Sequence, residues 1–274
     1  MSSIALGIIA PHPPIIVPPI GSEYDLKQVE KTISALKKVN KDIKQINPEI
    51  LITISPHSPV YRDAYAIRVQ NILMGSLSNF GYQQISIQMK NDATFIESLI
   101  KNMNKNSIKA IKIDENEEFF YGQNELDHGV IVPLYYLTDE DKYNLISLSI
   151  SFLNYQNHYN FGKVINKTVE ETGKTAVFIA SGDLSHRLKP GAPAGFHPEG
   201  EKFDKKIVEI INSSRFEELF QLDDKLIYNA GECGLRSIFV LAGCFDGKDV
   251  ESKVLSYEGP FGVGYMVAEI IPIQ

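Results

Sequence analysis

The stretch "IALGIIAPHPP" (residues 4–14) places a continuous apolar run directly before a histidine that stands between prolines. An apolar run of this length that ends at proline is typical of a strand covered on both faces of a sheet. Proline restricts its own backbone and pushes the preceding residue into an extended conformation, so His12 is expected on a stiff loop. The pattern predicts a buried strand with a preorganised histidine just beyond its end.

The same arrangement returns after one amphipathic segment. Apolar residues recur at helical spacing from Ser22 until Pro48 ends the pattern, and they are Leu26, Val29, Ile33, Leu36, Val39, Ile43 and Ile46. A second apolar run, "ILITIS" (50–55), then leads into "PHSP", so His57 also follows a strand. Strand, helix and strand in this order favour a parallel crossover. Both histidines are therefore expected at the carboxyl edge of one sheet, where α/β folds bind ligands.

The rest of the chain extends this pattern. Further strands are expected at 85–89, 110–113, 145–150, 175–181, 253–257 and 263–271, and helices at 91–104, 155–171 and 234–245. The Gly- and Pro-rich segment 187–200 is expected to be a surface flap and not a linker. The sequence thus predicts one α/β domain over residues 1–274, with a central, largely parallel sheet flanked by helices and a site at the carboxyl ends of the strands.

Composition narrows the class of protein. The formal charge of −7, without a basic cluster, argues against nucleic acid and against an anionic membrane surface, so small molecules are the expected partners. No apolar run approaches the roughly 20 residues of a membrane span. Cys233 and Cys244, if they share a helix, would lie about 16 Å apart, too far for a disulfide. These features predict a cytoplasmic protein without a membrane segment.

Histidines at strand ends indicate metal chemistry. Two imidazoles at adjacent strand ends are a common beginning of a site for Fe, Zn, Mn or Cu, and a carboxylate would complete a facial triad. His186 follows the expected strand 175–181, within "GDLSH". A neutral imidazole with a pKa near 6.5 can accept and return a proton. Asp183, three residues earlier, is expected either to orient the His186 ring or only to form the turn.

Five motifs in this order resemble one known family. They are "PHPP" (11–14), "SPHSP" (55–59), "DHG" with "VPL" (127–134), "GDLSH" (182–186) and "GECGLR" (231–236). Together they resemble the LigB-type subunit of class III extradiol ring-cleavage dioxygenases and the related Memo-like proteins. The likeness is strongest to the LigB-like part of AmmeMemoRadiSam system protein A, a branch that often carries a second, C-terminal domain, which is not expected within this chain.

The resemblance implies a metal site. It implies that His12 and His57 bind the metal, with Glu232 as the third ligand. Cys233 is the alternative third ligand, because Memo-like relatives use a cysteine in this region. Glu232 could instead cap the helix that follows it, where a negative charge is favourable.

The resemblance also implies roles around the metal. His186 would be the catalytic acid and base, and His128 would line the substrate side, unless His128 caps the next helix. His197, in the flap, is either a substrate contact or a surface residue. Arg236 of the "GECGLR" motif could pair with a carboxylate or bind a terminal carbonyl, and it is not assigned to the site.

The activity implied is that of an extradiol dioxygenase. Fe(II) is the expected metal, with Zn or Mn as alternatives, and the partners are a small catecholic compound and dioxygen. Two other functions stay open: a Memo-like metal-binding or interaction protein without ring cleavage, and a zinc hydrolase on the same ligands. A homodimer would be unsurprising for this family.

Overall fold

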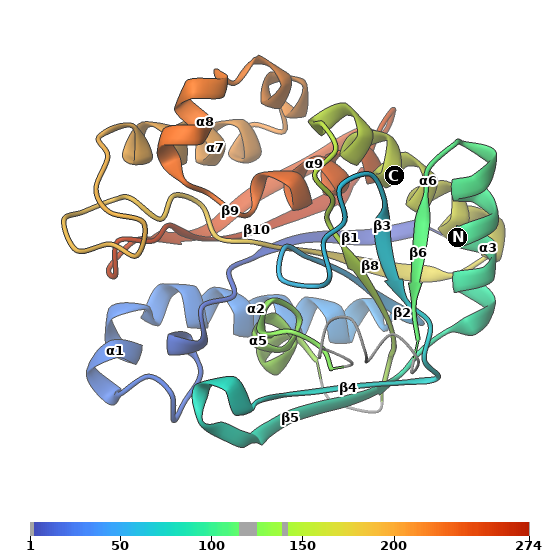
Figure 1. The fold of residues 1–274 in the computed structure, drawn as a ribbon, viewed down its shortest axis with the longest axis horizontal. Coiled ribbons are helices and arrows are strands. Elements are labelled where there is room, and N and C mark those ends of the chain that lie inside the picture. The colour runs from blue at the N-terminus through green and yellow to red at the C-terminus, as the bar shows by residue number, and fades with distance from the viewer. Residues whose placement is uncertain (1–2, 115–124, 139–141, 274) are drawn as a thin grey trace.

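The computed structural model describes residues 3–114, 125–138 and 142–273. In this part of the chain the main sheet has the strand order β6-β3-β7-β2-β8-β1-β10-β9, and β4 and β5 form a separate sheet (Figure 1). The strands are β1 (Ser3–Ala10), β2 (Ile50–Ser55), β3 (Tyr65–Arg68), β4 (Ile72–Leu77), β5 (Tyr82–Lys90), β6 (Ala110–Ile113), β7 (Asn144–Ser149), β8 (Thr175–Ser181), β9 (Val250–Glu258) and β10 (Tyr265–Pro272).

The helices lie on both faces of this sheet. They are α1 (Glu23–Gln28), α2 (Glu30–Ile46), α3 (Ala93–Lys105), α5 (His128–Leu137), α6 (Tyr155–Thr172), α7 (Glu199–Asn212), α8 (Asp224–Ala230) and α9 (Leu235–Cys244), with short 3-10 helices at Pro14–Ile16, Ser78–Phe80 and Phe216–Gln221. Figure 1 shows α2 and α5 below the main sheet and α7, α8 and α9 above it. The α/β fold with a largely parallel central sheet, predicted from the sequence, is confirmed.

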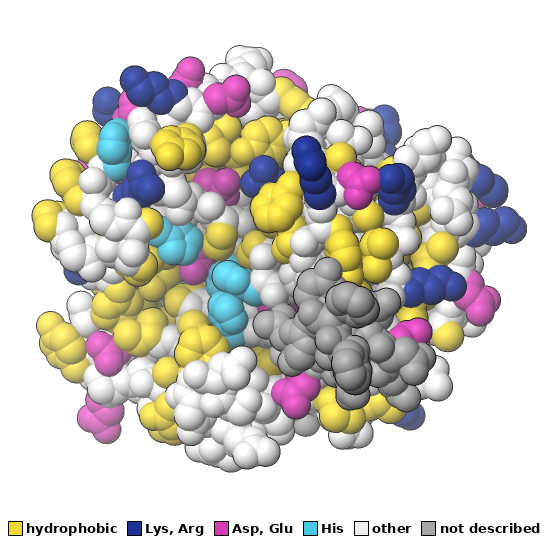
Figure 2. Space-filling model, viewed as in Figure 1, with side chains coloured by type: hydrophobic (Ala, Val, Ile, Leu, Met, Phe, Trp, Pro, Cys, Tyr) yellow, Lys and Arg dark blue, Asp and Glu magenta, His cyan; other side chains and the backbone are white. Residues whose placement is uncertain are grey.

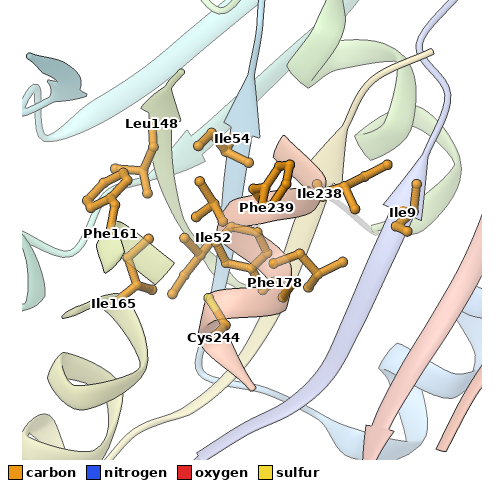
Figure 3. Packing of buried hydrophobic residues seen from close by; sticks show 14 of the residues in the cluster. Ile9, Ile52, Ile54, Leu148, Phe161, Ile165, Phe178, Ile238, Phe239 and Cys244 are labelled. Carbon is orange, nitrogen blue, oxygen red and sulfur yellow. The ribbon is translucent and has the colours of Figure 1, made fainter. Parts of the chain in front are cut away.

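The central strands are apolar on both faces because both faces are covered. Every residue of β2 is buried. Ile50, Ile52 and Ile54 pack into the core on one face, whereas Leu51 packs into the core on the other. Figure 3 shows Ile52 and Ile54 with Phe178 of β8, against Phe239 of α9. This two-sided burial explains why these strands are continuous apolar runs and do not alternate.

Glycines let α6 and α9 approach closely on that face. A Cβ at Gly162 would lie 2.0 Å from the carbonyl oxygen of Val240, and one at Gly243 would lie 1.9 Å from that of Tyr159. These are backbone contacts that a side chain could not avoid by rotating. The helix pair can therefore lie against the sheet only with glycine at both positions.

The strand order positions the site. β8 runs parallel to both β1 and β2 and lies between them. Ala10 pairs with Ser181, and Ala180 pairs with Ile54, so the carboxyl ends of the three strands are level. The expectation that the strands before His12 and His57 are adjacent is wrong, because the segment that ends in His186 is inserted between them. All three histidines still follow strands that end at one edge.

Other details also differ from the sequence-based expectations. The amphipathic segment 22–46 is two helices, because the backbone leaves the helical conformation at Val29. The strand expected at 85–89 is part of β5, which pairs with β4 outside the main sheet. Strands β3 and β4 and helices α7 and α8 were not predicted. Helix α7 begins within the expected flap, at Glu199.

Two absences can be stated for the described residues. None of their helices has the length and apolar content needed to cross a membrane. Cys233 and Cys244 are both free, and only Cys244 lies on α9, where it is buried in the core.

Candidate metal centre

His12 and His57 meet at the carboxyl edge of the sheet. Nε2 of His12 lies 3.0 Å from Nε2 of His57, and the two rings are nearly perpendicular. His12 is almost fully buried. Burial, and then the neighbouring histidines, hold the pKa of His12 well below its usual value, and burial also lowers the pKa of His57. Both imidazoles are therefore neutral near pH 7, as metal binding requires. Figure 2 shows histidine side chains together near the middle of this face.

Ser181 determines which nitrogen of His12 carries the proton. The Ser181 hydroxyl donates to the carbonyl oxygen of Gly129, so its oxygen must accept from Nδ1 of His12, 2.9 Å away. A hydroxyl has a single hydrogen, and the carbonyl takes it. The proton of His12 is thus on Nδ1, and the lone pair of Nε2 points to His57. Hydrogen bonding of one ring nitrogen to fix the other as a ligand is typical of metal-binding histidines.

Asp127 holds the loop that carries His57. Its carboxylate accepts hydrogen bonds of 2.6 and 2.5 Å from the hydroxyls of Ser55 and Ser58. It also accepts one from the N–H of Gly129 at the start of α5. The oxygen of Ser55 in turn accepts the N–H of His57. The two serines of the "SPHSP" motif therefore bind the acidic residue of the "DHG" motif. This network fixes the His57 loop to the N-terminus of α5.

Cys233 completes a group of possible ligands. One ligand atom each from His12, His57 and Cys233 lie within 4.8 Å of one another, and the Cys233 sulfur is 3.7 Å from Nε2 of His12. Burial raises the pKa of the Cys233 thiol well above its usual value. A bound cation would reverse that shift, because a metal-bound thiol loses its proton.

Glu232, the expected third ligand, lies outside this group in the structure. One carboxylate oxygen accepts a hydrogen bond of 2.6 Å from the N–H of Leu235, which is the first residue of α9. The side chain thus occupies the helix N-terminus, which was the alternative left open from the sequence. Although Glu232 and Cys233 are consecutive, their side chains have different partners: Glu232 contacts the first turn of α9, and Cys233 contacts His12.

Asp183 approaches His12 and not His186. One of its oxygens accepts the N–H of His12 at 3.0 Å, and the other lies 3.9 Å from Nε2 of His12. Burial raises the pKa of Asp183 to about 7. The expectation that Asp183 orients His186 is wrong, since Nδ1 of His186 donates to the carbonyl oxygen of Leu184. Asp183 instead supports the His12 loop and places a carboxylate beside His12.

The His186 ring is held by the backbone at Leu184 and Gly231. Because a carbonyl oxygen can only accept, the proton of the neutral ring lies on Nδ1 and Nε2 is unprotonated. Burial lowers the pKa of His186; hydrogen bonds to the backbone of Leu184 and Gly231 oppose this, and the charge of His57 lowers the pKa further. The ring is thus a neutral base near the two candidate ligands.

His128 and Phe80 form an aromatic side of the site. His128 begins α5 but does not cap it, because the cap is the side chain of Asp127. Its ring lies 4.2 Å from the His57 ring and 5.3 Å from the Phe80 ring, measured between centroids. Burial, followed by the charge of His57, lowers the pKa of His128 to about 4. Phe80 is 41% exposed and was not predicted as a site residue.

His197 lies in the loop before α7. Its Nδ1 accepts the N–H of Glu199 at 3.2 Å, and its own N–H donates to the carbonyl oxygen of Arg187. These contacts hold it at the start of α7, apart from the ligand group of His12, His57 and Cys233.

The donor set fits one metal ion. Two nitrogens 3.0 Å apart can both bind an ion at about 2.0–2.1 Å, and a thiolate binds at about 2.3 Å. Imidazole and thiolate suit Zn, Cu and Fe, whereas Mn prefers oxygen ligands. Sequence reasoning missed Ser181, Asp127, Ser55 and Ser58 as supports, although each stands within two residues of a motif histidine or beside a buried strand end.

Comparison with known proteins identifies the family of this chain. Residues 6–268 match the model of the family described as the catalytic LigB subunit of aromatic ring-opening dioxygenase. The protein CA_C1420 of Clostridium acetobutylicum is 36% identical over 264 residues, which are 96% of this chain and 56% of that protein. The chain thus spans little more than half the length of this relative.

More distant relatives have named activities. The 2-aminophenol 1,6-dioxygenase beta subunit of a Pseudomonas species is 26% identical over 255 residues, 83% of this chain and 80% of the relative. The 3,4-dihydroxyphenylacetate 2,3-dioxygenase of Escherichia coli is 25% identical over 141 residues, 48% of this chain and 51% of the relative. The crystal structure of the uncharacterized E. coli K12 protein JW3007 has the same fold, with a TM-score of 0.68 and 14% identity over 97% of this chain and 99% of that one.

Proposed function

Since the chain belongs to the family of catalytic LigB subunits of aromatic ring-opening dioxygenases, we propose that it is a metal-dependent, extradiol-type dioxygenase of a catecholic compound. One observation carries the proposal: the ring nitrogens of His12 and His57 converge at 3.0 Å, beside a neutral His186. We further propose that residues 1–274 act as a single catalytic domain.

The proposed ligands are His12, His57 and Cys233, with Glu232 as the alternative that the family resemblance implies. Fe(II) is the proposed metal, and it would supply a common centre that orients both reactants and takes up charge. Zn is the alternative that suits the thiol. Ser181 holds the proton of His12 on Nδ1, which leaves Nε2 available as a ligand.

The remaining residues are proposed to bind the substrate or to transfer its proton. Nε2 of His186 accepts a proton from a phenolic hydroxyl and returns it as the ring opens, while Leu184 keeps the other nitrogen protonated. The rings of His128 and Phe80 give an aromatic wall against which an aromatic substrate can pack. His197 is a further proposed substrate contact, because its side chain is half-buried in the loop before α7. The proposed partners are dioxygen and a small aromatic compound. The protein itself is proposed to act as a homodimer.

The ligand group also supports a second candidate. Cys233, and not a carboxylate, joins the two histidines in the group of possible ligands. Thiolate and imidazole are common zinc ligands, so a Memo-like metal-binding protein without ring cleavage, or a zinc hydrolase, fits the same atoms.

Oxygen consumption separates these candidates. The purified protein is reconstituted with Fe(II) without oxygen and then mixed with aerobic buffer and a panel that includes catechol, 2-aminophenol and 3,4-dihydroxyphenylacetate. The panel follows the substrates named for the relatives. We expect oxygen uptake with a coloured ring-opened product, and loss of both in His186→Ala, with His197→Ala as a variant in which turnover persists at a reduced rate.

Two outcomes would contradict the dioxygenase. Stoichiometric iron without oxygen uptake on any compound of the panel would favour the metal-binding alternative. Hydrolysis of ester or amide substrates by the zinc-loaded protein, with no reaction of the iron-loaded protein, would favour the hydrolase.

A further inference from the structure

A second pocket lies beside the candidate metal centre. It has a volume of about 420 Å³ and lies among the first turns of α6 and α9 and helix α8. Its lining includes Arg187 and Arg236, the aromatic residues Tyr155 and Tyr228, and the acidic residues Asp224 and Glu232. None of the three candidate metal ligands lines it.

The two arginines of this pocket have unused hydrogen-bond donors. Nε of Arg187 and Nε of Arg236 are both buried and have no hydrogen-bond partner in the part of the chain that the structure describes. Among the described residues, the guanidinium of Arg187 makes one hydrogen bond, from Nη1 to the carbonyl oxygen of Asn229, at a long 3.5 Å. Arg236 lies over the ring of Tyr155, 5.5 Å from its centroid. A guanidinium has five donors, and buried donors are normally satisfied by protein, water or ligand.

The acidic residues of the pocket do not satisfy these donors. The carboxylate of Glu232 is engaged with the N–H of Leu235 at 2.6 Å. Asp224 is exposed at the first turn of α8. Among the residues that the structure describes, neither carboxylate forms an ion pair with Arg187 or Arg236. Arg236 also stands in the first turn of α9, where a cation is unfavourable by itself; the charge of the nearby Glu232 interacts with it but leaves its Nε–H without a hydrogen bond.

We propose that Arg187 and Arg236 form a binding site for the oxyanion of a small molecule, either a carboxylate or a phosphate group. The planar fork of a guanidinium matches both groups, and two forks on one pocket can hold a single anion from two sides. The exposed Tyr228 ring at the pocket gives the ligand's organic part an apolar surface. The ligand therefore belongs to the class of small organic acids or phosphate esters.

The chain connects this pocket directly to the metal centre. His186 and Arg187 are consecutive, and so are Glu232 and Cys233, with one member of each pair in each site. Gly231 lines the pocket and precedes the pair of Glu232 and Cys233. A Cβ at Gly231 would lie 3.0 Å from Nε of Arg187, so the Gly231 backbone packs closely against this arginine. Because none of His12, His57 and Cys233 lines the pocket, anion binding is expected not to depend on a bound metal.

The unpartnered Nε–H groups are the direct probe of this site. The purified protein, labelled with ¹⁵N, is titrated with sodium phosphate in one arm and sodium benzoate in the other, at constant ionic strength set with chloride. We expect the Nε–H signals of Arg187 and Arg236 to shift and saturate. Saturation by benzoate alone assigns a carboxylate, and saturation by phosphate alone assigns a phosphate ester. The same titration of protein freed of metal by a chelator is expected to give the same affinity for the anion.

Variants test the assignment. Arg187→Gln and Arg236→Gln should each weaken anion binding at least about tenfold, since each removes charge-assisted hydrogen bonds. Arg62→Gln, at an exposed arginine outside the pocket, should bind as the wild type does. If a glutamine variant does not fold, Arg236→Lys keeps the charge without the fork and should bind more weakly than the wild type. Shifts that never saturate, or that are equal at all arginines, would overturn the proposal.

Discussion

Nε2 of His12 and Nε2 of His57 lie 3.0 Å apart, although 45 positions separate the two residues in the sequence. Ser181 keeps the lone pair of the His12 nitrogen directed at this contact. Since Nε2 of His12 has no proton, this contact needs either a proton on Nε2 of His57 or a cation between the two nitrogens. The contact therefore leads to predictions about metal binding.

Replacement of His57 by alanine should remove the metal. His57→Ala leaves two of the three grouped ligands, and we expect the affinity for Fe(II) or Zn to fall more than about 100-fold, beyond the loss seen for residues that only support ligands. The fold should persist because His57 is on a loop. Metal content after dialysis, with circular dichroism for the fold, measures both. His197→Ala is the matched control, and full metal occupancy in His57→Ala would contradict the site.

Cys233→Ala and Glu232→Gln together identify the third ligand. We expect Cys233→Ala to weaken metal binding at least about tenfold, and to abolish the thiolate charge-transfer absorption of the cobalt-loaded protein. Glu232→Gln should keep the metal, because the amide oxygen can still accept the N–H of Leu235. The reverse result, with metal lost only in Glu232→Gln, would restore the carboxylate as the ligand.

Ser181→Ala should weaken metal binding without touching a ligand. The change removes the acceptor of the His12 Nδ1 proton, and loss of such a partner typically costs about 10–100-fold in affinity. Ser147→Ala is a matched control, since Ser147 is equally buried in the sheet but its hydroxyl has no partner. Equal affinities of the two variants, measured by competition with a metal indicator, would show that Ser181 does not orient His12.

Asp204 should make the stability fall with increasing pH. Burial raises the pKa of Asp204 to about 7, from about 3.9 in an unfolded chain. The folded protein therefore binds a proton that the unfolded chain has released between these values. The stabilisation is complete below about pH 4 and is lost as the pH rises through about 7, at about 1.4 kcal/mol per pH unit.

Asp204→Asn tests this slope, since an amide does not titrate but can still accept the N–H of Ser185. Urea unfolding with a chelator, at several pH values between about 5 and 8, should give a flatter profile than the wild type. Asp183 has a pKa of about 7 as well, so part of the slope should remain. Glu251→Gln, at an exposed acid, should leave the profile unchanged. An unaltered slope in Asp204→Asn would be the contrary result.

Gly162→Ala should destabilise the protein despite the higher helix propensity of alanine. The new Cβ would lie 2.0 Å from the carbonyl oxygen of Val240, so α6 and α9 would have to separate. We expect a net loss of about 1–3 kcal/mol in the free energy of unfolding, against a gain of about 0.5–1 kcal/mol at an unconstrained helical glycine. Asn160→Ala, at an exposed position of α6, is the control in chemical denaturation. A stabilised Gly162→Ala would mean that the helices are not in contact there.

Local patterns were sufficient for much of the fold. Apolar runs bounded by prolines predicted β1 and β2, and the apolar period of 22–46 predicted the helical segment between them. These signals are local because a strand buried on both faces and an amphipathic helix each need a specific pattern of side chains. The short β3 and β4 escaped prediction, and of β5 only the segment 85–89 was expected. The place of β3 depends on pairing with β6 and β7, which are distant in the sequence.

The same division holds for the site. The prolines around His12 and His57, and the ends of their strands, predicted that both histidines would lie at one edge of the sheet. Only the tertiary structure inserted β8 between the two strands, and only it showed which of Glu232 and Cys233 faces the histidines. Adjacent side chains point in different directions, and their partners come from loops far away in the chain. The sequence therefore specifies which residues can act together, while the packing of the strands selects those that do.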